Sequence, residues 1–160
     1  PYIMLTIVGW RADFSRRWIP VAMGGAAIPD LVKIEILVDS GTIEQLAGVP
    51  FSYSPISSLG GVLVIGAGIT VLFERRVYSR VYGFLLFGGV TSLIVDGLRV
   101  FADGYADFWL YPLWVRPPTS SLYVTSNPNV LLGTLATAGI VTLVDRYIQD
   151  SEGRLPAAEP

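Results

Sequence analysis

Two aspartates stand in apolar stretches of the chain, where a carboxylate is unusual. Asp30 follows the small-residue run "GGAAIP", and Asp96 follows "GGVTSLIV". An acid in a membrane-embedded segment usually faces the interior of a helical bundle, where it pairs with another group or marks a functional site. Asp30 and Asp96 are therefore the candidate catalytic residues, able to hold a cation or to activate water, and the candidate metal ligands.

Helical spacing gives these acids a set of polar neighbours. Gly88, Ser92 and Asp96 are four residues apart and share one face of a helix, as do Ser57 and Gly61. Small residues let membrane helices approach closely, so we expect these faces to pack around the acids. The candidate pocket residues are Ser57, Ser92, Glu35, Lys33 and Arg99.

A purely structural role for the same acids is an open alternative. Asp30 and Lys33 stand at i,i+3 spacing, as do Asp96 and Arg99, so each acid has a cation on the same side of its helix. Asp30 is also suited to cap a helix that restarts after Pro29, because its carboxylate can accept freed N–H groups.

The residue types that are missing restrict the chemistry. The chain has no histidine and no cysteine, which excludes His-activated nucleophiles and disulfides. For Ser57 and Ser58, helix packing or capping is therefore a better interpretation than nucleophilic attack. An oxygen-only ligand set favours either no metal or Mg²⁺, Mn²⁺ or Ca²⁺ over Zn²⁺.

Composition indicates which elements hold these residues. The chain of 160 residues is 52% hydrophobic and 15% charged, against about 25% charged for a typical soluble domain. We expect an all-α, multispanning integral membrane helix bundle over residues 1–148 and a polar tail over 149–160. About 20 apolar residues cross a bilayer, and the expected segments, about five in number, are 1–10, 18–38 (interrupted at Pro29), 55–73, 78–98 and 121–144.

Arginines in the connecting segments predict the orientation. One side of the membrane would hold Arg11, Arg16, Arg17, Arg75, Arg76, Arg80, Arg146 and Arg154, whereas the other side has Arg99 and Arg116 with the acids Asp39, Glu44, Asp103 and Asp107. The predicted arrangement is a multi-pass protein of the plasma membrane with its N-terminus outside and its C-terminus in the cytoplasm. Both acids then lie toward the outer face. The aromatic run at 105–115 is interpreted as an outer interfacial segment.

Four motifs resemble the YdjM-like family of membrane-bound metal-dependent hydrolases. They are "GGAAIPD", "SPISSLGG", "GGVTSLIVDGL" and "DGYADFWLYPLWV", in the family's order and over about two-thirds of the chain. The resemblance implies a multispanning protein with a carboxylate site at one membrane face. Ser57 and Ser92 stand where the family has histidine, and Val32 stands where a second acid often follows Pro-Asp, so a working metal centre is not carried over.

Enzymatic activity is therefore left open. The leading hypothesis is a membrane-embedded homologue of metal-dependent hydrolases with a degenerate or lost metal site. The alternatives are a non-catalytic membrane scaffold or partner subunit, and a small ion or solute transporter that uses the break at Pro29. The expected partners are the lipid bilayer and a membrane protein or a second copy of the chain. The net charge of −2 argues against nucleic acid.

Overall fold

The computed structural model describes residues 1–9, 16–101, 105, 108–115, 117–118, 121–124 and 127–152. Its helical elements are α1 (Tyr2–Gly9), η1 (Arg16–Trp18), α2 (Ile19–Ala26), η2 (Pro29–Ile36), α3 (Ser40–Ala47), η3 (Ser54–Ser57), α4 (Leu59–Thr70), η4 (Arg75–Val77), α5 (Tyr78–Gly97) and α6 (Pro128–Glu152). Within these residues the only β pairing consists of isolated bridges. The predicted all-α class is confirmed.

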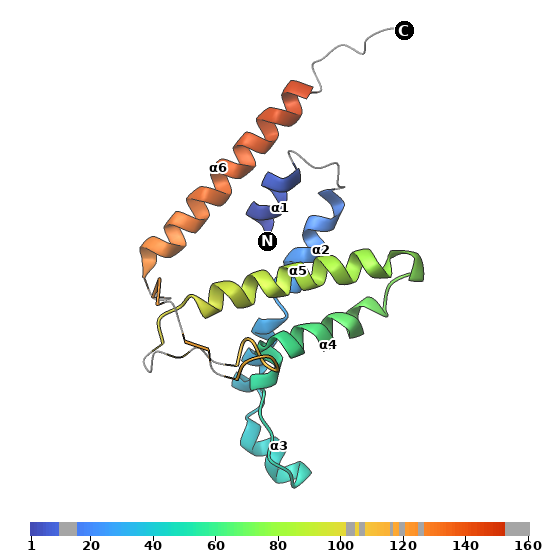
Figure 1. Ribbon diagram of the computed structural model, residues 1–160, viewed down its shortest axis with the longest axis vertical. Coiled ribbons are helices and arrows are strands. Elements are labelled where there is room, and N and C mark those ends of the chain that lie inside the picture. Colours follow the sequence, from blue (N-terminus) through green and yellow to red (C-terminus); the bar gives the residue numbers. More distant parts are fainter. Residues whose placement is uncertain are drawn as a thin grey trace.

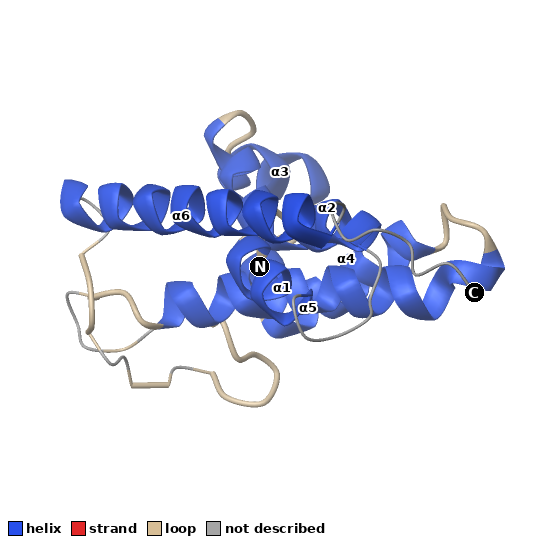
Figure 2. Cartoon of the chain, turned by 90° about the horizontal axis from the view of Figure 1, so that it is seen from above, coloured by secondary structure: helices blue, strands red, loops and turns tan. Residues whose placement is uncertain are grey.

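Helices α4 and α5 form an antiparallel hairpin, and α2 crosses α5 (Figure 1). The long helix α6 stands beside α1, and Tyr2 Oη lies 2.7 Å from Thr142 Oγ1. Seen from above, α6 is nearest the viewer and passes in front of the other helices (Figure 2). The core is in two parts, one around Leu5, Ile19 and Ala22 and the other around Ile28, Val62 and Leu93.

Glycines make the crossing of α2 and α5 possible. A Cβ atom built on Gly88 would overlap the carbonyl oxygen of Ala22 and lie 2.8 Å from the nitrogen of Ala26. A Cβ atom on Gly25 would overlap the backbone of Leu85 in the same way. Since the two backbones are in direct contact, no side chain fits between them. The predicted small-residue face is present, but Gly88 packs against α2 rather than against the 55–73 segment.

Two described helices are long and apolar enough to cross a membrane, at Arg75–Gly97 and Pro128–Ile148. They correspond to the fourth and fifth predicted segments, and α6 begins at Pro128, inside the fifth segment, rather than at residue 121. The third segment has an α-helix of only 12 residues, α4. The first and second contain α-helices of only 8 residues. Five full-length spanning helices are therefore not observed.

Some predictions concern residues outside the described part of the chain. These include the charges of Arg11, Asp103, Asp107, Arg116 and Arg154, and residues 153–160 of the tail. Helix α6 extends to Glu152, and its apolar part ends at Ile148. Of the predicted interfacial segment 105–115, the structure describes Tyr105 and residues 108–115.

Candidate functional site

A cavity of about 380 Å³ lies at the end of the bundle where α5 ends and α4 begins. Its walls come from η2, η3, the end of α5 with the residues just after it, and the aromatic segment. The lining residues are Pro29, Asp30, Val32, Lys33, Ser54, Ser57, Asp96, Gly97, Arg99, Phe101, Phe108 and Trp109. The two acids that were singled out from the sequence therefore line one cavity, although 66 positions separate them along the chain.

Asp30 reaches the cavity because the chain breaks before it. Helix α2 ends at Ala26, and the N–H groups of Ala27 and Ile28 bond three residues back, to Gly24 and Gly25. Pro29 has no N–H group to continue an α-helix, and it is fully buried. The interruption predicted at Pro29 is confirmed.

Asp30 is paired within its own element. It lies in the first turn of η2, and Lys33 Nζ approaches its Oδ1 to 2.6 Å. This is the i,i+3 ion pair foreseen as a structural alternative. Asp30 is not the N-cap residue of η2, which is Ile28, but the second residue of the element. Both side chains are more than half exposed, so the pair is worth at most about 1 kcal/mol in water.

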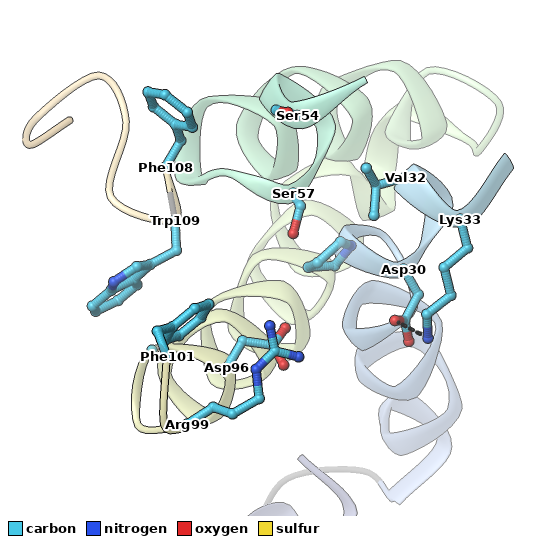
Figure 3. Close-up of a pocket in the computed structure, with 12 residues that line it drawn as sticks. Asp30, Val32, Lys33, Ser54, Ser57, Asp96, Arg99, Phe101, Phe108 and Trp109 are labelled. Carbon is cyan, nitrogen blue, oxygen red and sulfur yellow. Dashed lines mark ion pairs between the residues drawn. The ribbon is translucent and has the colours of Figure 1, made fainter. Parts of the chain in front are cut away.

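Asp96 is positioned by the last turn of α5 and is partly buried. It lines the same cavity as Asp30, Lys33 and Arg99. In Figure 3, Arg99 and Asp96 lie together on one side of the cavity, the Asp30–Lys33 pair lies on the other, and the hydroxyl of Ser57 points toward the space between them. One acid and one base thus stand on each side of the cavity.

Arg99 is held by a backbone clamp just beyond α5. Val100 N donates to Tyr123 O at 2.9 Å, and Leu122 N donates to Leu98 O at 2.9 Å. Tyr123 Oη donates to Val95 O at 2.9 Å. The guanidinium of Arg99 also lies 4.7 Å from the ring centre of Phe101, within the range of a cation–π contact. These contacts fix the turn on which Arg99 stands.

The aromatic wall is attached to the start of α4. Leu59 N donates to Trp109 O at 2.8 Å, and Gly60 N donates to Tyr111 O at 2.9 Å. Gly97 lets the indole of Trp109 approach the end of α5, since a Cβ atom there would lie 2.7 Å from the indole ring. The aromatic segment was interpreted from the sequence as an interfacial belt. The structure instead gives Phe108 and Trp109 a place in the cavity wall.

The remaining candidate residues divide into two groups. Ser57 lines the cavity, whereas Ser92 and Glu35 are not among the lining residues. Glu35 accepts a hydrogen bond from Ser40 Oγ at 3.2 Å on the exposed surface. Ser58, which is fully buried, caps α4 by accepting from Gly61 N at 3.1 Å, and it donates to Pro55 O at 2.6 Å. The capping role expected for a serine of this motif is therefore confirmed at Ser58.

The donor set of the cavity offers few free ligands to a divalent cation. It has two carboxylates, of which Asp30 is already within 2.6 Å of Lys33 Nζ. Lys33 and Arg99 balance the two acids and would repel an added metal ion. In the described part of the chain, no group of three or more His, Cys, Asp or Glu side chains could hold a metal. Calcium sites use about six to eight oxygen ligands and structural zinc sites use nitrogen or sulfur, whereas magnesium can be held by one or two carboxylates together with water.

In the part of the chain that the structure describes, the fold is helical, two helices are long and apolar enough to cross a membrane, and a charged, aromatic-lined cavity lies at an end of the bundle. The chain matches no model of a protein family, and it matches neither a curated protein nor a solved structure.

Proposed function

We propose that this protein is an integral membrane protein that binds a small zwitterionic molecule in the cavity, without a metal ion and without hydrolysing it. The observation that carries the proposal is the meeting of Asp30, Lys33, Asp96 and Arg99, two acids and two bases, around one cavity with aromatic walls. A ligand with one positive and one negative group leaves this charge balance intact. A divalent cation would upset it.

Membrane residence is supported by the surface of α6. Its large apolar side chains Leu131, Leu135, Ile140 and Leu143 are each at least 60% exposed. Soluble monomers rarely expose long continuous apolar surfaces, so lipid is the natural surrounding of this helix. The finer proposal is a multi-pass protein of the plasma membrane, with the N-terminus and the cavity outside and the C-terminus in the cytoplasm.

The breaks in the helices also suit a membrane setting. Irregular backbone at membrane depth is tolerated where it is buried in protein or lines a water-filled cavity. The break at Pro29 and the irregular turn before Leu59 both border the cavity. The short apolar helices α2 and α4 would then form partial crossings whose broken ends face the ligand.

Each part of a zwitterion has a chemical partner in the cavity. The planar guanidinium of Arg99 is suited to a phosphate or carboxylate group. The carboxylate of Asp96 is suited to an ammonium group, and the rings of Phe108 and Trp109 line the same space, where aromatic faces attract cations. We propose that the Asp30–Lys33 pair completes the opposite wall.

The proposed function also accounts for the positions at which the chain departs from the YdjM-like hydrolases that it resembles. The acids of the family pattern are kept at Asp30 and Asp96, and the expected histidines are replaced by Ser57 and Ser92. Serine hydroxyls are poor substitutes for imidazole as metal ligands or as general bases. We propose that the chain is a non-hydrolytic homologue that acts alone or as a partner subunit in the membrane.

Calorimetric titration of the purified full-length chain in detergent tests the proposal. The probe is glycerophosphoethanolamine, and the controls are glycerol phosphate, which carries only the anion, and ethanolamine, which carries only the cation. We expect binding of the zwitterion to exceed that of either control at least tenfold. Asp96→Asn and Arg99→Gln should each weaken it, whereas Ser92→Ala, on α5 but outside the cavity lining, should not.

Two results would overturn the proposal. One is equal binding of all three probes, or no binding of any, by a protein whose circular dichroism shows that it is folded. The other is an equimolar divalent metal in elemental analysis of the wild-type chain that is absent from Asp96→Asn. The second result would instead support a metal site held by the acids.

A further inference from the structure

The turn that joins α4 and α5 lies at the far end of the hairpin from the start of α4 and the end of α5 (Figure 1). Residues on both sides of this turn line a second cavity. It has a volume of about 300 Å³ and is lined by Ala67, Thr70 and Val71 from the end of α4 and by Tyr78, Ser79 and Tyr82 from the start of α5. None of these residues belongs to the charged cavity.

Three of the four hydroxyl side chains that line this second cavity donate to backbone carbonyl groups. Tyr78 Oη donates to Val71 O at 3.3 Å, and Tyr82 Oη donates to Leu63 O at 3.3 Å. Thr70 Oγ1 donates to Gly66 O at 2.7 Å. Because these hydroxyls are already bonded, the tyrosine rings and aliphatic groups make most of the wall. The cavity therefore suits a hydrocarbon chain rather than a polar solute.

Positive charge is concentrated in the part of the chain next to this cavity. The stretch 74–80, which includes η4 and the first residues of α5, carries three exposed arginines, Arg75, Arg76 and Arg80, against one acid, Glu74. Arg76 Nε lies 3.6 Å from Glu74 Oε1, and both side chains are largely exposed. Two positive charges thus remain in excess, whereas acids and bases are equal in number around the charged cavity.

Two of these arginines are close to the cavity along the chain. Arg75 lies in η4, three residues before Tyr78, and Arg80 directly follows Ser79 in the first turn of α5. Tyr78 and Ser79 line the cavity. Because an arginine side chain is long and keeps its charged end in water, both guanidinium groups are suited to meet a head group at the edge of the cavity.

We propose that this second cavity binds an anionic phospholipid, with part of an acyl chain in the cavity and the phosphate at Arg75 and Arg80. The apolar walls select an amphiphile, and the excess positive charge selects an anionic head group. The site is separate from the zwitterion site in position and in charge, and it shares with the proposed function only the assumption of membrane residence.

Native mass spectrometry of the full-length chain in detergent tests this site. The probes are phosphatidylglycerol, diacylglycerol with the same chains, and glycerol phosphate. We expect retention of phosphatidylglycerol well above that of the other two. An arginine near an anionic lipid surface is worth about a fivefold change in affinity, so Arg75→Gln combined with Arg80→Gln should lower retention of phosphatidylglycerol more than tenfold.

Matched variants distinguish binding in the cavity from the effects of surface charge and of added side-chain volume elsewhere on the protein. Ala67→Phe fills the cavity and should reduce retention, whereas Val64→Phe adds the same ring to an exposed position of α4 outside the cavity and should not. Arg146→Gln removes an exposed arginine from α6 and should leave retention unchanged.

Equal retention of diacylglycerol, or an equal loss in Val64→Phe and Ala67→Phe, would overturn the proposed lipid site. So would an equal loss in Arg146→Gln and Arg80→Gln. Asp96→Asn should leave phosphatidylglycerol retention at the wild-type level, so failure of the zwitterion site and failure of the lipid site give different results.

Discussion

Replacing Gly88 by alanine tests the helix crossing that positions the whole cavity end of the molecule. The added methyl group would meet backbone atoms, the oxygen of Ala22 and the nitrogen of Ala26, rather than the movable end of a side chain. Only a shift of α2 relative to α5 can make room. Because α2 leads directly into Pro29 and Asp30, such a shift would also disturb the charged cavity.

The magnitude follows from two opposing effects. Overpacking a close contact costs about 1–3 kcal/mol and sometimes more, and the rigid backbone contact at Gly88 puts the cost at the upper end, about 3 kcal/mol. Alanine gains up to about 1 kcal/mol over glycine through helix propensity. The expected net loss for Gly88→Ala is therefore about 2 kcal/mol or more.

Gly83→Ala is the matched control, since it makes the same substitution in the same helix. A Cβ atom on Gly83 meets nothing within 4 Å, so this variant should be as stable as the wild-type chain or slightly more stable. The measurement is unfolding in mixed micelles by increasing SDS, followed by far-ultraviolet circular dichroism. Equal stabilities for Gly88→Ala and Gly83→Ala would refute the proposed backbone contact.

Three further results are expected from single substitutions. Ser58→Ala should lower the free energy of unfolding by about 1–2 kcal/mol through loss of the cap, and Ser57→Ala should leave it nearly unchanged in the same SDS titration. Lys33→Ala should change it by less than about 1 kcal/mol, because exposed ion pairs contribute little; a larger loss would show that the pair with Asp30 is structural. Burial, aided by the charge of Asp96 and opposed by that of Arg99, raises the pKa of Tyr123, so folding favours its neutral form. The contribution of Tyr123 to the free energy of unfolding is complete below about pH 10 and disappears as the pH rises through the folded pKa. If the high-pH end of the tyrosinate absorbance titration is the same in Tyr123→Phe as in the wild-type chain, the raised pKa is wrong.

Local sequence patterns predicted those features that depend on near neighbours along the chain. The helical class follows from apolar runs, the break from Pro29, and the cap of α4 from the serines of its motif. The Asp30–Lys33 pair has the same origin, because i,i+3 spacing brings the two side chains together in η2. The approach of Asp30 and Asp96 was expected only on the assumption of a shared membrane level.

Other features required contacts between distant segments. Hydropathy does not show that α4 begins only at Leu59, where the carbonyl groups of Trp109 and Tyr111 accept its first N–H groups. It does not show that Phe108 and Trp109 line the cavity, because an aromatic run has the same composition in a membrane belt and in a binding site. Hydropathy also does not show which helix packs against the small-residue face that includes Gly88.

The sequence by itself determined that the chain is helical, that it lacks histidine and cysteine, and that two acids interrupt apolar segments. These properties are local or compositional, and they do not depend on how the chain folds back on itself. Only the tertiary structure decided that Ser92 and Glu35 stand apart from the cavity while Arg99 and the aromatic segment line it with the acids. The physical reason is that a helix face lines a cavity only where another element packs against that helix. The direct backbone contact at Gly88 and the clamp between Val100 and Tyr123 establish that packing here.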